Sequence, residues 1–263
     1  MLGAITGDVI GSIYEFDNYR GTDFPLFDPN STFTDDSVLT VATAEVLLNN
    51  GNYMEAYRDF GARYPNAGYG GMFNNWLHQE DPQPYDSFGN GSAMRVVPVG
   101  WGFETLDEVI DEAKRSAEVT HNHSEGIKGA QVTAATVFAA RTGASREKLR
   151  ELVDKLSDYN LDRSVDQVRE VYKYNETCQE TVPEAIIAFL ESTDFEDAIR
   201  KAISLGGDSD TLACITGGIA EAFYGGVPAS IATKVFDRLN PHLRQIVNQF
   251  DQRFMNGRYK THY

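Results

Sequence analysis

The feature that most constrains the fold is the spacing of the apolar residues, which recur every three or four positions along most of the chain. That interval is the repeat of an α-helix, and no segment shows the strict alternation, bounded by turn residues, that indicates strands. Helices are predicted over residues 36–48, 106–119, 126–140, 146–156, 183–190, 195–205, 211–223, 229–239 and 243–250. We therefore predict an all-α protein with about ten or more helices, packed into one compact domain that spans residues 1–263.

Local signals predict where some of these helices begin. Ser145 is a candidate N-cap, because its hydroxyl can accept a hydrogen bond from a free backbone N–H in a first turn. Thr181 and Glu184 have the spacing of a capping box, and Pro183 between them is expected in the first turn of its helix.

Composition narrows the environment and the partners. Apolar residues make up 41% of the chain, and no run approaches the ~18 apolar residues that a membrane span requires. The amino-terminal segment lacks basic residues and carries Asp8 where a secretory signal would be apolar, so no such signal is expected. Cys178 and Cys214 are predicted to be free thiols, as in a cytoplasmic protein. The net charge of −16 would repel nucleic acid, and a monomer is expected.

Acidic residues cluster at the starts of two predicted helices, in Thr34-Asp35-Asp36 and in Gly206-Gly207-Asp208-Ser209-Asp210-Thr211. Each cluster alone is explained by helix capping, since Thr, Asp and Ser satisfy the free N–H groups of a first turn. Together they offer four carboxylates and two threonine hydroxyls, an all-oxygen set that suits Mg²⁺ or Mn²⁺ rather than structural zinc. Four carboxylates around one ion would leave excess negative charge, so two ions are predicted rather than one.

The first predicted helix carries two stripes. Its glycines recur at every fourth position, at Gly3, Gly7 and Gly11, and form a flat face that another backbone can approach closely. Asp8, Ser12 and Glu15 form a polar stripe on the same helix. Exposure to solvent is the simplest explanation for Glu15, but a polar stripe in an apolar, glycine-lined helix favours a carboxylate of a metal or catalytic site.

A glycine-rich loop precedes a short predicted helix that begins near Ser92. The loop, residues 79–92, ends in Gly89-Asn90-Gly91-Ser92, and a second long loop of similar composition covers residues 17–33. Successive Gly, Asn and Ser residues leave backbone N–H groups free, and such a turn can hold a phosphate without a lysine. Turn formation alone would explain the same composition.

Two histidines, His121 and His123, lie in the link between two predicted helices. They could ligate a metal, but the carboxylates that suit one lie elsewhere in the sequence. Capping or surface exposure is the simpler explanation for such a pair, and contact with a nucleotide is the more specific one.

In chain order, these motifs resemble those of the ADP-ribosylglycohydrolases, a family that includes the dinitrogenase reductase-activating glycohydrolase. The matching segments lie within residues 3–211; they are 3–15, 34–36, 89–95, Thr120-His121 with Gly126, and 206–211. The resemblance implies a single compact, orthogonal multi-helix domain of the ADP-ribosylglycohydrolase type, with two divalent ions, Mg²⁺ or Mn²⁺.

The resemblance also implies roles for individual residues. The metal ligands it implies are Thr34, Asp35, Asp36, Asp208, Asp210 and Thr211, with Asp210 as the bridge. The substrate-binding residues it implies are Ser87, Phe88, Gly89, Asn90, Gly91, Ser92 and His121. Glu15 is the first candidate for the general acid or base, with Asp35 or Asp36 in reserve.

The function implied is metal-dependent hydrolysis of the glycosidic bond at C1″ of the distal ribose in an ADP-ribosylated protein or small molecule. ADP-ribosyl-arginine is the expected substrate, and ADP-ribosyl-serine or a modified base is an alternative. Two other functions would use similar motifs: a non-catalytic ADP-ribose or nucleotide binder, and a metal phosphohydrolase that attacks the diphosphate. The complete acidic set favours an enzyme over a binder.

Overall fold

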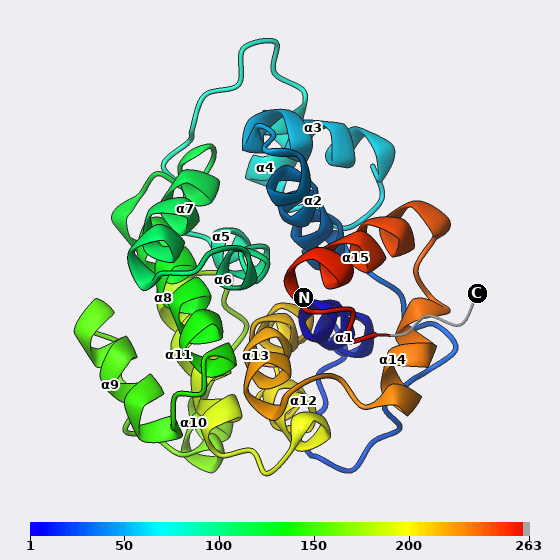
Figure 1. Ribbon diagram of the computed structural model, residues 1–263. Coiled ribbons are helices and arrows are strands. Elements are labelled where there is room, and N and C mark those ends of the chain that lie inside the picture. Colours follow the sequence, from blue (N-terminus) through cyan, green and yellow to red (C-terminus); the bar gives the residue numbers. More distant parts are fainter. Residues whose placement is uncertain (260–263) are drawn as a thin grey trace.

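The protein is almost entirely helical. The computed structural model describes residues 1–259, and this part of the chain contains fifteen helices and no strand (Figure 1). They are α1 (Leu2–Gly11), α2 (Asp35–Asn49), α3 (Tyr53–Arg63), α4 (Gly71–Leu77), α5 (Gly91–Met94), α6 (Val99–Gly102), α7 (Leu106–Glu118), α8 (Ser124–Arg141), α9 (Arg146–Leu156), α10 (Val165–Val171), α11 (Cys178–Leu190), α12 (Phe195–Ser204), α13 (Ser209–Tyr224), α14 (Ala229–Phe236) and α15 (Pro241–Phe254). The prediction of an all-α fold is confirmed, and each predicted range contains a helix.

Capping side chains define several helix starts. The Ser145 hydroxyl accepts a hydrogen bond from the Lys148 N–H at the start of α9, as predicted. The sequence analysis missed α3, although Asn52 caps it by accepting from the Glu55 N–H. It also missed α4, α6 and α10, which are too short for their apolar spacing to stand out.

The capping box predicted for Thr181 and Glu184 is wrong, because α11 begins at Cys178 and contains Pro183 in its interior. The earlier start is anchored by the Cys178 N–H, which donates to the Phe88 carbonyl at 2.9 Å. Pro183 lies early in the helix, where its missing N–H removes a single backbone hydrogen bond. Nearly all of α11 is buried, and this packing offsets that loss.

Helices α1 and α13 form the centre of the molecule and pack directly on one another (Figure 1). The predicted glycine stripe of α1 allows this approach: a Cβ added to Gly7 would lie 1.9 Å from the Ala213 carbonyl oxygen. A Cβ on Gly3 would lie 2.2 Å from the Gly217 carbonyl oxygen, and a Cβ on Gly11 would lie 2.5 Å from the Asp210 Cα. The stripe therefore brings the end of α1 against the start of α13.

Gly7→Ala is expected to destabilise the protein by about 3 kcal/mol, because the added methyl group would overlap the Ala213 backbone. Chemical denaturation followed by circular dichroism measures the change. Gly51→Ala is the matched control, because the nearest atom to a Cβ there is 3.7 Å away and the residue is exposed. Equal stability of the two variants would contradict the close packing of α1 on α13.

The remaining helices surround this pair. Helices α8, α11 and α12 pack on α13, while α2 packs on α1 and is covered by α3 and α15. Buried apolar side chains from these helices form one continuous core. Cys178 and Cys214 are buried and unpaired, as predicted. None of the helices within residues 1–259 is long and apolar enough to cross a membrane.

The polar stripe predicted for the first helix is interrupted. Helix α1 ends at Gly11, so Glu15 lies in the turn that follows rather than on the helix. The chain turns there because the Tyr14 N–H donates to the Gly11 carbonyl at 2.8 Å. This turn places Glu15 beside the start of α13.

Candidate active site

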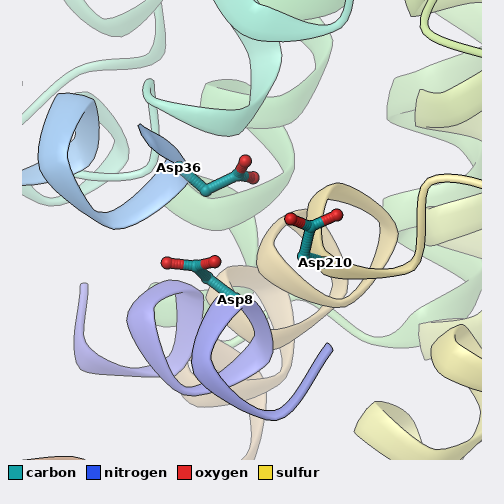
Figure 2. Close-up of side chains that lie close together, drawn as sticks. All are labelled: Asp8, Asp36 and Asp210. Carbon is teal, nitrogen blue, oxygen red and sulfur yellow. The ribbon is translucent and has the colours of Figure 1, made fainter. Parts of the chain in front are cut away.

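Acidic side chains converge where α1, the turn after it, and the starts of α2 and α13 meet. Oxygen atoms of Asp8, Asp36 and Asp210 lie within 4.8 Å of one another, and so do those of Glu15, Asp208 and Asp210. Figure 2 shows the first group, with one aspartate from each of the three helices pointing into a common space. Asp210 belongs to both groups and therefore links them.

Asp8 holds the start of α2 in place. Its carboxylate accepts hydrogen bonds from the Thr34 N–H at 2.9 Å, the Thr34 hydroxyl at 2.7 Å and the Ser37 N–H at 3.1 Å, and also from the Ser37 hydroxyl. The Thr34 hydroxyl gives its proton to Asp8 and accepts from the Asp36 N–H at 3.3 Å, which leaves one lone pair of its oxygen as an acceptor. Asp8 thus orients the Thr34-Asp35-Asp36 turn towards the acidic site.

Two glycines orient the acids at the start of α13. Gly206 and Gly207 have φ angles of 73° and 72°, in the left-handed region that favours glycine. Asn18 clamps this turn, accepting from the Gly207 N–H at 2.7 Å and donating to its carbonyl at 2.9 Å. The Asn90 amide donates to Asp208 Oδ2 at 2.7 Å. Both long predicted loops therefore help to hold the acidic site.

Burial and mutual repulsion oppose ionisation of these acids. Burial, followed by the negative charges of neighbouring aspartates, raises the pKa of Asp36 and of Asp210 well above the ordinary value. Burial also raises the pKa of Asp8 and of Asp208. The pKa of Glu15 rises to about 7, through burial and then the charge of Asp208. The site therefore carries unfavourable negative charge that a cation would neutralise.

The acidic site forms one wall of a cleft of about 370 Å³, a size typical of small-molecule sites. Most of the predicted site residues line it; these are Glu15, Thr34, Asp35, Asp36, Ser87, Phe88, Gly89, Asn90, Gly91, His121, Asp208, Asp210 and Thr211. Ser92 does not: it is fully buried behind the loop, where its hydroxyl donates to the Gly126 carbonyl at 2.7 Å. Among the described residues that line the cleft, Arg95 is the one lysine or arginine.

The glycine-rich loop has fewer free N–H groups than the sequence predicts. The Asn90 N–H donates to the Glu176 carbonyl at 2.7 Å, and the Gly89 N–H donates to the Ser87 hydroxyl at 3.1 Å. These contacts arise because residues 176–178, which precede and open α11, pair with the loop. The Gly89 and Asn90 N–H groups are therefore not free to bind an anion at this turn.

The two histidines have different surroundings. His123 caps α8, because its Nδ1 accepts from the Glu125 N–H at 3.1 Å, which is the simpler of the two predicted explanations. His121 is buried and lines the cleft next to Gly89 and Gly91, where it can contact a ligand.

The donor set fits a divalent cation. The two acidic groups contain only carboxylates, and the Thr211 hydroxyl lies beside them, 3.2 Å from Asp36 Oδ2. Asp36 Oδ1 is buried and has no hydrogen-bond partner among residues 1–259. A buried anionic oxygen without a partner is costly unless a cation neutralises it. Carboxylate and hydroxyl oxygens are the ligands that Mg²⁺ and Mn²⁺ prefer.

Part of the cleft around Glu15 is not predicted by any motif of the sequence. The Tyr174 hydroxyl lies 3.2 Å from Glu15 Oε1 and 2.8 Å from Glu176 Oε1. Its ring stacks on Phe16, with the ring centroids 6.5 Å apart. Residues 172–177 form an irregular segment without a motif, so nothing in the sequence pointed to them. Asp8 does carry a signal, since it is a charged residue within an apolar helix, but the sequence predicts it only as a member of the polar stripe.

The fold and the site together define an all-helical protein in which two acidic helix starts face a cleft bordered by a glycine-rich loop. A family model described as ADP-ribosylglycohydrolase matches residues 1–260, so the chain belongs to the ADP-ribosylglycohydrolase family. Its activity at the level of the family is therefore that of a hydrolase that removes ADP-ribose by cleaving a glycosidic bond.

Individual relatives cover most of the chain. The human ADP-ribosylhydrolase ARH3 is 28% identical over 306 residues, which cover 86% of this chain and 84% of ARH3. The ADP-ribosylarginine hydrolase Tri1 of Pseudomonas putida (strain GB-1) is 26% identical, over 96% of this chain and 77% of Tri1. A solved structure of an ADP-ribosylglycohydrolase-related protein complex has a TM-score of 0.69 at 25% identity and covers 95% of this chain and 96% of that chain. The family resemblance is therefore confirmed.

Proposed function

We propose that the protein hydrolyses ADP-ribosyl-arginine at the bond between C1″ of the distal ribose and the guanidinium nitrogen, with two Mg²⁺ or Mn²⁺ ions in the acidic site. The observation that carries this proposal is the position of Asp210, which belongs to both acidic groups and can therefore bridge two ions. The cleft beside the acids has room for a nucleotide ligand.

In this proposal, the ions would be held by Asp36, Asp208 and Asp210, which belong to the two acidic groups. Thr34, Asp35 and Thr211 would complete the ligand set; they line the cleft, although Asp35 belongs to neither acidic group. Ions held there would supply positive charge that orients hydroxyl groups of the distal ribose and stabilises negative charge on oxygen. The surrounding carboxylates favour the positive charge that develops near C1″ in an oxocarbenium-like transition state. His121 and the loop from Ser87 to Gly91 bind the diphosphate and the adenosine.

Glu15 is the proposed general acid/base. The oxygen of a water molecule bonds to C1″ while the C1″–N bond breaks, and Glu15 carries a proton from the water to the leaving nitrogen. The products are ADP-ribose and arginine. Without ions, burial and then the charge of Asp208 raise the pKa of Glu15 to about 7. The larger cause, burial, persists when ions bind and favours the proton-carrying form that this role requires.

The surroundings of Glu15 suit a cationic leaving group. Glu176 supplies a second carboxylate, and Tyr174 and the exposed ring of Phe16 supply aromatic faces next to it. Carboxylates and aromatic rings are the partners that a guanidinium group prefers, whereas a serine hydroxyl would need neither. The name of Tri1, an ADP-ribosylarginine hydrolase, also supports this linkage.

The test is incubation of the protein with ADP-ribosyl-arginine and Mg²⁺ or Mn²⁺, with and without EDTA, followed by mass spectrometry of the products. Intact ADP-ribose and arginine, formed only without EDTA, are the expected result. AMP as a product would mean that the diphosphate is cleaved instead. Cleavage of ADP-ribosyl-serine or of an ADP-ribosylated base, but not of the arginine conjugate, would overturn the proposed linkage.

Glu15→Gln is expected to lower kcat by roughly 10²- to 10⁴-fold, because the amide cannot transfer a proton. Glu176→Gln is the matched comparison, since Glu176 also lies within hydrogen-bond distance of Tyr174 but is proposed only to bind the leaving group. This second variant should raise KM with little change in kcat. Steady-state kinetics on ADP-ribosyl-arginine separate the two effects, and an equal loss of kcat in both variants would remove Glu15 from its proposed role.

A further inference from the structure

His121 is buried and lines the cleft next to the glycine-rich loop. The hydrogen bonds of its ring determine whether it can donate to a ligand or accept from it. Its Nδ1 lies 2.7 Å from the Thr120 hydroxyl oxygen. Its Nε2 faces the glycine-rich turn, 3.2 Å from the position of a Cβ on Gly91 and 3.5 Å from one on Gly89. Whether Nε2 carries a proton determines whether His121 donates to a ligand or accepts from it.

Arg95 fixes the direction of the hydrogen bond between these two residues. It is fully buried, with its guanidinium carbon 4.2 Å from the centroid of the Tyr57 ring. Its Nη2 donates to the Thr120 hydroxyl oxygen at 2.7 Å and to the Ser116 carbonyl at 3.1 Å. A guanidinium group has no acceptor, so the Thr120 oxygen can only accept from Arg95. The hydroxyl proton of Thr120 must then point elsewhere.

His121 Nδ1 is the best acceptor for that proton. The Tyr85 hydroxyl is the competing acceptor, since it also forms a side-chain hydrogen bond with Thr120, but a neutral phenol oxygen is a weaker acceptor than an imidazole nitrogen. If Nδ1 carried a proton, it would donate to an oxygen that already accepts from a cation, and the Thr120 proton would lose its best partner. Burial, followed by the charge of Arg95, holds the pKa of His121 well below its ordinary value, so the ring carries a single proton.

We propose that Arg95 and Thr120 act as positioning residues that fix His121 in the neutral tautomer protonated on Nε2, so that it presents an N–H donor to an anionic oxygen of the ligand at the glycine-rich turn. The Nε2–H group of His121 supplies a donor at a turn where the Gly89 and Asn90 N–H groups already donate to other groups of the protein. That the anion is the diphosphate of ADP-ribose rests on the proposed function, whereas the tautomer is a property of the free protein.

The test is ¹⁵N NMR of the histidine side chains in the ligand-free protein, with His121→Gln used to assign the signals of His121 among the five histidines. The expected result is an unprotonated Nδ1 and a protonated Nε2. Thr120→Val, which removes the hydroxyl at nearly constant volume, should shift the ring towards the other tautomer and weaken binding of ADP-ribose, in the presence of Mg²⁺, about tenfold. Thr120→Ser, which keeps the hydroxyl, should restore both properties.

A protonated Nδ1 of His121 in the wild-type protein would overturn the proposal, and His121→Gln serves in this measurement only to assign the signals. An unchanged tautomer in Thr120→Val would overturn the role of Thr120. A tautomer that changes in Tyr85→Phe but not in Thr120→Val would assign the role to Tyr85 instead. If the wild-type protein showed the expected tautomer but did not bind ADP-ribose, the proposed function would fail while the tautomer assignment would stand.

Discussion

Asp210→Asn is expected to reduce hydrolysis of ADP-ribosyl-arginine by about a thousandfold or more. Asp210 belongs to both acidic groups, so its loss removes a ligand from each of the two proposed ions at once. An asparagine keeps the size of the side chain but not its charge, and it would present an amide group to ions that prefer anionic oxygen. The rate is measured with saturating substrate and excess Mg²⁺ or Mn²⁺.

A matched control separates the loss of a ligand from the loss of a buried carboxylate as such. Glu112 is also buried, and it accepts from the Tyr53 hydroxyl and from Arg115 outside the cleft. Glu112→Gln should therefore keep a rate close to that of the wild-type protein. A high concentration of Mn²⁺ is not expected to rescue Asp210→Asn, because the bridging position itself is gone. A rate within tenfold of wild type in Asp210→Asn would contradict a bridging role.

Local signals made the acidic helix starts predictable from the sequence. Thr34 caps α2 by accepting from the Asp36 N–H, and the two glycines before Asp208 adopt the left-handed turn that their type favours. Such signals act within a few residues, and so does the apolar spacing that predicted the helices. The glycine stripe of α1 could be predicted for the same reason, because a four-residue repeat defines one helix face.

Contacts between distant segments could not be predicted in the same way. Asp8 and Thr34 are 26 residues apart, and Glu15 and Tyr174 are 159 apart. The first pair meets because α1 packs on α2. The second pair meets because the segment before α11 reaches the cleft that Glu15 lines. The start of α11 was misjudged for the same reason, since a contact with the distant Phe88 loop sets it. The sequence therefore indicates which groups are chemically suitable, and tertiary packing decides which of them meet.

The metal-free protein is expected to lose stability through the acidic site as the pH rises from the ordinary pKa of an aspartate towards the raised pKa values of the folded state. In the absence of an ion, burial and neighbouring charges raise the pKa of Asp36, Asp210, Asp8 and Asp208 in the folded state. An acid whose pKa is higher in the folded protein than in the unfolded chain contributes its full stability at low pH. That contribution disappears as the pH rises through the raised folded value, because the folded state must then hold unneutralised charge.

Addition of Mg²⁺ or Mn²⁺ should reverse this trend, since the ions bind the ionised acids of the folded state. At about pH 7.5, a concentration near 100 times Kd should raise the melting temperature by roughly 5–10 °C, and the rise at about pH 5 should be much smaller. Differential scanning fluorimetry with EDTA-treated protein measures both. Asp210→Asn should melt higher than the wild-type protein without metal at the higher pH, because one repelling charge is gone, and should respond little to either ion. If the two proteins melted together without metal and rose equally with it, the acidic groups would be neither mutually repelling nor metal-binding, and the site would have to be sought elsewhere in the cleft.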